Sequence, residues 1–220
     1  MTVKVKICGI RTPEALDAAL DSGAQWFGLV FYPRSPRNVT LETARALVAR
    51  ARGRIPAVAL LVDPGDAQIE DVVSTVAPQW LQLHGDETPE RVAEIRKRFG
   101  LPVIKAIRVA GEAEAKQAIA YDGIADMVLF DALPPGDDAA ALPGGNGVPF
   151  DWRALRNMTR AKRHFILSGG LTPGNVQAAI AATGAETVDV SSGVESAPGV
   201  KDPARIRAFI RAAQGAVAAV

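Results

Sequence analysis

The feature that most constrains this chain is a regular alternation of short β-branched or apolar runs with longer segments rich in Ala, Leu, Glu and Arg. Such alternation is typical of βα units arranged around a parallel sheet. Eight runs have strand character, and eight parallel strands close a barrel. We therefore predict the α/β class, as a (βα)8 TIM barrel. The expected strands are residues 3–8, 26–31, 57–62, 80–84, 103–108, 127–131, 164–168 and 187–191.

A doubly wound open sheet is the alternative architecture for repeated βα units. It often carries a Gly-x-Gly-x-x-Gly turn after its first strand. The sequence Cys8-Gly9-Ile10-Arg11 is no such turn, which favours the closed barrel. A length of 220 residues suits one barrel, so we expect a single, monofunctional domain over 1–220.

Four dipeptides predict where helices begin, because a capping side chain stands directly before a first-turn proline. They are Thr12-Pro13, Thr88-Pro89, Thr172-Pro173 and Asp202-Pro203. The first two are each followed by a glutamate, which favours the positive end of the helix dipole.

Charge and cysteine content narrow the function classes. A formal net charge of +1 argues against a nucleic-acid partner or an anionic membrane surface. A single cysteine excludes an internal disulfide and a multi-cysteine metal site. The N-terminus lacks the apolar region of a signal peptide and no run approaches the ~20 residues that span a bilayer, so we expect a cytoplasmic protein.

Strand alternation gathers polar side chains at one end of the predicted barrel. Side chains point alternately inward and outward, and the apolar set should face the helices. Cys8, His84, Asp131 and Asp189 then point inward from four different strands, near the C-terminal mouth where barrel active sites lie. Three of them also have a structural interpretation: an inert buried thiol for Cys8, a supporting histidine for His84, and for Asp189 an acid that braces the last strand. Their convergence favours a reacting site.

Two small-residue turns predict an anion site at the same mouth. Loops after the seventh and eighth strands are the usual phosphate seat of this fold. Here these turns are Ser168-Gly169-Gly170-Leu171 and Ser191-Ser192-Gly193-Val194-Glu195. After the second strand, Pro36 stiffens the loop at Arg37, whose planar fork suits a carboxylate or phosphate; Arg34 is interpreted as a solvated cation. The Pro- and Gly-rich segment 133–149 is either a functional loop or a tolerated insertion.

Several motifs together resemble the phosphoribosylanthranilate isomerase family of tryptophan biosynthesis. They are KICGI, FYPRSPR, LQLHG, the strand that ends in Asp131, SGGL, DVSSGVE and PGVKD, and they run in order from residue 4 to about residue 202. Segment 133–149 departs from the family pattern near Asn146 and Val148, which puts loop closure in doubt rather than the reaction.

The resemblance implies an Amadori rearrangement of N-(5-phosphoribosyl)anthranilate to the carboxyphenylamino-deoxyribulose phosphate, without metal or cofactor. It implies Cys8 as the base at ribose C2 and Asp131 as the acid at the ring oxygen. Arg37 should meet the anthranilate carboxylate, with Asp189 and His84 beside the substrate. The phosphate would lie against Gly169, Gly170, Ser192 and Gly193. A small-molecule phosphosugar is thus the expected partner, for a monomer or a homodimer.

A thiol base needs help, since an ordinary thiol has a pKa of ~8.5 and is mostly protonated at neutral pH. We expect a neighbouring charge to lower the pKa of Cys8, with Lys6 and His84 as candidates.

Two other phosphosugar barrels and one non-enzyme remain alternatives. A ribulose-phosphate epimerase would need metal-binding histidines, and the chain has only His84 and His164. An indole-glycerol-phosphate synthase would need a strand lysine as its acid, for which Lys105 is the candidate. A catalytically silent barrel that senses a phosphosugar would need neither Cys8 nor Asp131.

Overall fold

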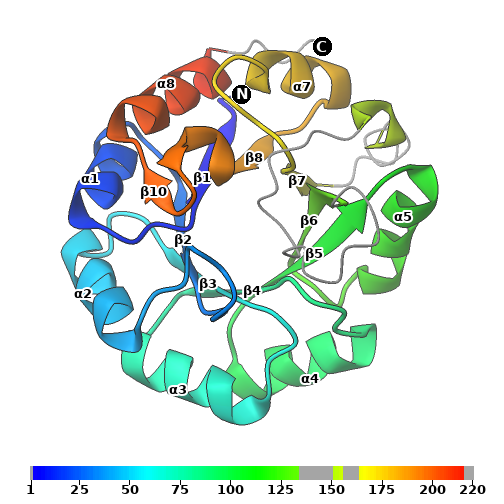
Figure 1. The fold of residues 1–220 in the computed structure, drawn as a ribbon. Coiled ribbons are helices and arrows are strands. Elements are labelled where there is room, and N and C mark those ends of the chain that lie inside the picture. The colour runs from blue at the N-terminus through cyan, green and yellow to red at the C-terminus, as the bar shows by residue number, and fades with distance from the viewer. Residues whose placement is uncertain (1, 134–150, 156–163, 216–220) are drawn as a thin grey trace.

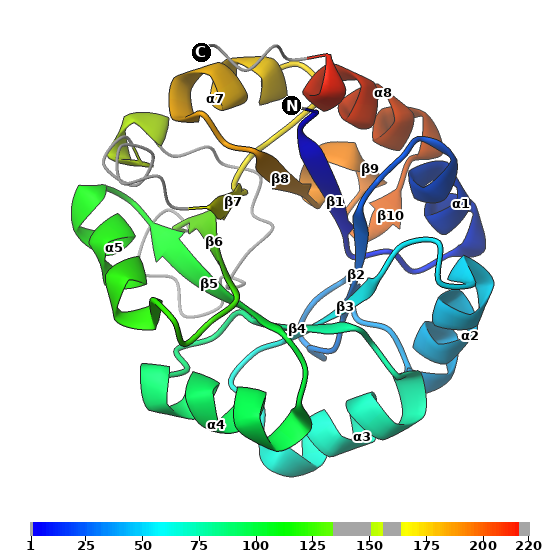
Figure 2. The same cartoon turned by 180° about the vertical axis from the view of Figure 1, so that it is seen from behind.

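The computed structural model describes residues 2–133, 151–155 and 164–215. Eight parallel strands close into a barrel in sequence order, with β1 hydrogen-bonded to both β2 and β8. Helices surround the strands in Figure 1, and the view from the opposite side in Figure 2 shows the same ring. The predicted TIM barrel is confirmed. The barrel strands are β1 (Lys4–Cys8), β2 (Trp26–Val30), β3 (Ala57–Leu61), β4 (Trp80–Leu83), β5 (Val103–Val109), β6 (Met127–Ala132), β7 (Phe165–Leu167) and β8 (Thr187–Val190).

The helices begin largely where the capping signals predict. Thr12, Thr88 and Asp202 each accept hydrogen bonds from the first turn of the helix that follows. The α-helices are α1 (Pro13–Asp21), α2 (Leu41–Ala51), α3 (Asp66–Val76), α4 (Pro89–Phe99), α5 (Glu112–Lys116), α7 (Val176–Thr183) and α8 (Pro203–Gln214). Short 3₁₀ helices are η1 (Gln117–Tyr121), η2 (Trp152–Leu155) and η3 (Ser192–Val194), and β9 (Glu195–Ala197) pairs with β10 (Val200–Lys201).

The expected helix start at Thr172-Pro173 is wrong. Helix α7 begins at Val176, and Asn175 precedes it. The Asn175 side chain accepts a hydrogen bond from the Thr172 N–H at 2.7 Å and donates one to the Gly170 carbonyl at 2.9 Å. Such local side-chain bonds stabilise a turn at the expense of the helix.

Strand alternation divides the apolar side chains into an outer and an inner layer. The outer cluster between strands and helices includes Val5, Ile7, Leu81 and Leu83, as the parity argument predicts. The inner layer is separate; its buried members are Val58, Ile104, Ala106, Leu129 and Ile166. A third small cluster, with Cys8, Val30 and Leu60, lies above it at the mouth.

Buried ion pairs supplement this core. Lys6 on β1 and Asp189 on β8 pair at 2.8 Å across the seam where the first and last strands meet. Lys105 donates to Glu87 at 2.7 Å and to the Gly85 carbonyl at 2.6 Å, so it holds the loop after β4. Within the described ranges no helix is long and apolar enough to cross a membrane.

Candidate active site

One pocket at the C-terminal mouth brings together most of the residues that the sequence singles out. It is lined by side chains from β1, β2, β3, β6 and β8 and by the loops after β2, β4, β7 and β8. The predicted site residues that line it are Cys8, Arg37, His84, Asp131, Gly169, Gly170, Asp189 and Ser192. The remaining predicted residue, Gly193, is not among the lining residues.

Cys8 ends β1 with its side chain at the pocket wall, and it is 5 % exposed. Gly28 on β2 makes room for it: a Cβ there would lie 2.9 Å from Cys8 Sγ and 3.3 Å from Lys6 Nζ. The thiol and the Lys6 ammonium are thus neighbours inside the barrel. Asp189 accepts the Lys6 bond at 2.8 Å and a bond from Ser168 Oγ at 3.3 Å.

The expectation of a lowered Cys8 pKa is wrong for the protein without substrate. Burial raises the pKa of Cys8 above its ordinary value; Lys6 and Lys201 lower it, while the Asp189 charge raises it. Desolvation disfavours the thiolate more than the two ammonium groups favour it. Of the two candidates, Lys6 lowers the pKa of Cys8 as expected, whereas His84 is not among the groups that shift it.

His84 belongs to the acid side of the pocket. Its Nε2 lies 3.2 Å from Asp131 Oδ2, and its Nδ1 lies 2.9 Å from the Gln82 amide nitrogen. With that nitrogen donating, the proton of neutral His84 is on Nε2. Among the described residues, Nε2 has no partner with hydrogen-bond geometry. Nε2 is therefore a buried donor whose polar neighbour in the pocket is the Asp131 carboxylate.

Two turns form the wall on the β7 and β8 side. Ser168 to Leu171 and Ser191 to Ser192 line the pocket together. Gly193 packs directly against the turn after β7, because a Cβ at this position would collide with the Leu171 carbonyl oxygen. The expected loop at 133–149 lies, apart from Leu133, outside the described residues.

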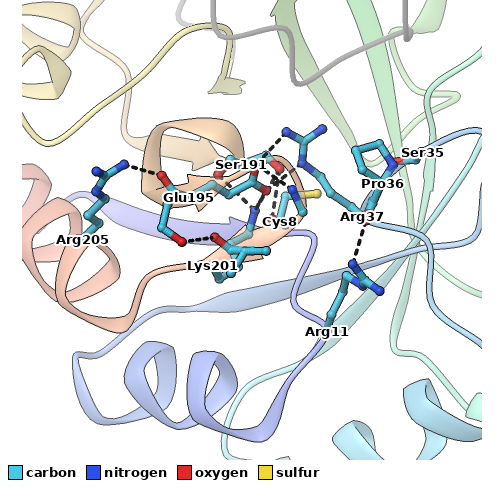
Figure 3. A network of polar contacts seen from close by, with 12 residues as sticks. Cys8, Arg11, Ser35, Pro36, Arg37, Ser191, Glu195, Lys201 and Arg205 are labelled. Carbon is cyan, nitrogen blue, oxygen red and sulfur yellow. Dashed lines mark hydrogen bonds and ion pairs between the residues drawn. The ribbon is translucent and has the colours of Figure 1, made fainter.

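A cluster of charged side chains extends from the pocket into the β9–β10 pair (Figure 3). Arg37 donates from Nε to Glu195 Oε1 at 2.8 Å and from Nη2 to Glu195 Oε2 at 2.9 Å. Lys201 donates to the same Oε1 at 2.5 Å. Glu195 and Lys201 are residues of this cluster that the sequence pattern did not single out, although both lie in the motifs DVSSGVE and PGVKD.

The described residues contain no group of three or more His, Cys, Asp or Glu side chains placed to hold a metal ion. Lys105, the candidate acid of a synthase, is paired with Glu87 and does not line the pocket.

The fold and the pocket define a (βα)8-barrel enzyme with a thiol, a carboxyl group and an imidazole at its mouth. Residues 5–212 match the family model described as N-(5'phosphoribosyl)anthranilate (PRA) isomerase. The chain therefore belongs to the N-(5'-phosphoribosyl)anthranilate isomerase family. It is an isomerase of tryptophan biosynthesis that carries out the Amadori rearrangement.

Individual relatives agree with this membership. The N-(5'-phosphoribosyl)anthranilate isomerase of Paramagnetospirillum magneticum is 52% identical over 215 residues, covering 98% of this chain and 99% of that protein. The isomerase of Rhodopseudomonas palustris is 53% identical over 214 residues and 97% of each chain.

Solved structures agree as well. The Thermotoga maritima phosphoribosyl anthranilate isomerase is 37% identical with a TM-score of 0.85, over 97% of this chain and 99% of that one. A structure of the same kind of enzyme in complex with reduced 1-(o-carboxyphenylamino)-1-deoxyribulose 5-phosphate is 36% identical with a TM-score of 0.83, over the same shares.

Proposed function

We propose that Cys8 and Asp131 are the base and the acid of the isomerisation in this chain. Asp131 gives a proton to the furanose ring oxygen, which opens the sugar to a Schiff base. Cys8, as the thiolate, takes the proton from ribose C2, and the resulting enolamine tautomerises to the aminoketone. The observation that carries the proposal is that β1 and β6 deliver these two groups to the same pocket.

Lys6 supports the base in this proposal. It is fully buried, its ammonium lies beside the thiol, and its charge lowers the pKa of Cys8. Burial by itself would lower the pKa of Lys6, but Asp189 and Cys8 outweigh burial and raise it, so Lys6 stays charged. A buried ammonium therefore faces the sulfur throughout the neutral pH range.

The other residues bind the substrate. Arg37 would meet the anthranilate carboxylate, while Gly169, Gly170 and Ser192 would hold the phosphate through main-chain N–H groups. Gly193 would keep the β8 turn close to the β7 turn rather than contact the phosphate directly. Asp189 and His84 would contact the sugar hydroxyls or the amine. All but Gly193 line the pocket, which supports these assignments.

Turnover followed by the fluorescence of phosphoribosylanthranilate tests the proposal. Cys8→Ala and Asp131→Asn should each lower kcat by about 10²-fold or more, the usual contribution of a positioned proton-transfer group. Asp17→Asn is the control, because Asp17 pairs with Arg50 on the exposed outer face of α1 and α2. Full activity of either site variant would contradict the role assigned to that residue.

We also propose that residues 1–220 form one domain. The barrel strands run from Lys4 to Val190, and α8 returns to pack against α1 and β1. A cytoplasmic location, the lack of a nucleic-acid partner and a monomeric or homodimeric assembly stay predictions; the Thermotoga maritima isomerase is described as dimeric.

A further inference from the structure

Arg37 reaches the pocket with its guanidinium already fixed by another side chain. Two bonds, at 2.8 and 2.9 Å, join its Nε and Nη2 to the two oxygens of Glu195. Such a paired arrangement holds the planar guanidinium in one orientation, which a single bond would not do. The Arg37 side chain is 7 % exposed and that of Glu195 is 4 % exposed, so the pair is shielded from water.

Glu195 is itself held in place from several directions. Its Oε1 accepts from Lys201 at 2.5 Å, and its Oε2 accepts from the Gly199 N–H at 3.2 Å. Arg205 donates to its main-chain carbonyl. Burial alone would raise the pKa of Glu195, but the bonds from Arg37 and Lys201 lower it. The carboxylate is therefore a charged, immobile partner for Arg37 before any substrate binds.

The same cluster connects the two loops that would hold opposite ends of the substrate (Figure 3). Arg37 follows β2, whereas Glu195 and Lys201 follow β8. Lys201 also donates to the Ser191 carbonyl at 3.0 Å, and Ser191 Oγ donates to the Cys8 carbonyl at 3.2 Å. The orientation of Arg37 is thus set by the element that carries the predicted phosphate turn.

We propose that Glu195 is a positioning residue that orients Arg37 toward the substrate carboxylate and thereby sets the preference for a carboxylate-bearing aromatic amine. The proposal rests on the role given to Arg37 above. Glu195 does not touch the reacting atoms; it acts through the guanidinium, and Lys201 balances its charge.

Two ligands separate this role from a general structural one. The first is reduced 1-(o-carboxyphenylamino)-1-deoxyribulose 5-phosphate, and the second is its phenylamino counterpart, which keeps the sugar phosphate but lacks the carboxylate. Calorimetry gives a Kd for each ligand. The Kd of the phenylamino ligand divided by the Kd of the carboxylate-bearing ligand measures the preference for the carboxylate. Glu195→Gln should lower that ratio about tenfold, because its amide cannot accept both guanidinium bonds and the charge-assisted pairing with Arg37 is lost. Affinity for the phenylamino ligand should change little.

Companion variants make each outcome decisive. Glu195→Asp keeps the charge facing Lys201 but shortens the reach, so it should fold and also lose preference. Arg37→Ala should abolish the preference, and adding Glu195→Gln to it should have no further effect. Asp17→Asn, which breaks the paired bonds from Arg50 at the surface, should leave the ratio unchanged.

The variants distinguish an error in the inference about Glu195 from an error in the role assigned to Arg37. If Arg37→Ala leaves the ratio unchanged, the assignment of Arg37 is wrong. If Arg37→Ala abolishes the preference while both Glu195 variants retain it, the inference about Glu195 is overturned. Equal weakening of both ligands by both Glu195 variants would also overturn it, since it would mean that Glu195 only braces the loop.

Discussion

At the scale of single residues, burial and a neighbouring positive charge have opposite effects on the pKa of one thiol, Cys8. The pocket wall around Cys8 removes water from the thiol, and this burial raises its pKa. Lys6 opposes that effect only partly, because its charge is shared with Asp189. The unliganded protein therefore holds Cys8 mainly as the neutral thiol. In the mechanism proposed above, the thiolate would form once substrate is bound.

Alkylation of the only cysteine, Cys8, measures this directly. Because the pKa of Cys8 is raised, the thiolate fraction is small at pH 7 and the iodoacetamide rate should still be rising steeply at pH 9. Lys6→Met should slow alkylation further at pH values below the thiol pKa, since it removes the charge that most lowers this pKa. A rate that levels off at or below pH 8.5, the ordinary thiol value, would contradict the prediction.

The lowered pKa of Glu195 should make the free energy of unfolding depend on pH in the acidic range. Its pKa is lowered in the folded protein, whereas the unfolded chain has the ordinary value of ~4.3. The stabilisation is therefore complete above the unfolded pKa and is lost as pH falls through the lowered, folded pKa. In urea titrations, the gap in unfolding free energy between wild type and Glu195→Gln should narrow between pH 6 and pH 3. A gap that is constant or widens on acidification would refute this.

At the scale of elements, the strands do most of the positioning. Each predicted strand lies within one residue of an observed boundary at both ends. Alternation along a strand then settles which side chains face the pocket, so Cys8, Asp131 and Asp189 are predictable from local pattern alone. Turns are less predictable, as the Asn175 side chain shows by delaying α7.

The contacts that local pattern cannot reveal are those between distant segments. Arg37 and Glu195 are 158 residues apart, and nothing near either one indicates the other. The burial that raises the pKa of Cys8 is likewise a property of the assembled mouth rather than of the KICGI run. Which residues line the pocket could therefore largely be predicted from the sequence. How their charges pair and shift the pKa of Cys8 could be seen only in the structure.

Gly28 on β2 lies against Cys8, so a side chain at this position should lower the reaction rate. In Gly28→Ala the new Cβ would press on Cys8 Sγ, 2.9 Å away, and on Lys6 Nζ. We expect kcat to fall by about tenfold or more, because displaced proton-transfer groups lose much of their ~10²- to 10⁴-fold contribution. Gly65→Ala is the matched control, since nothing lies within 4 Å of its Cβ. Equal rates for both variants would show that the thiol tolerates displacement.

At the scale of the whole molecule, the barrel closes through a charged seam. Lys6 and Asp189 join the first strand to the last, and both are almost completely buried. Asp189→Asn should destabilise the protein by about 3–5 kcal/mol, because it leaves a buried ammonium without its counter-charge. Lys6→Met combined with Asp189→Leu should recover most of that loss, at the expense of activity.

Urea denaturation measures both variants. The surface pair of Arg50 and Asp17 provides the comparison, since Asp17→Asn should cost no more than about 1 kcal/mol at such an exposed position. If Asp189→Asn costs as little as Asp17→Asn, the seam is not held by this charge pair.

The seam also has a consequence for the order in which the protein is made. Lys6 leaves the ribosome 183 residues before Asp189, so its counter-charge does not exist while most of the chain is being synthesised. Until then, burying the unpaired ammonium would be costly, so we expect the N-terminal strand to keep Lys6 exposed to water. A nascent chain halted before β8 should leave Lys6 reactive toward amine reagents, and only the arrival of the last strand should protect it.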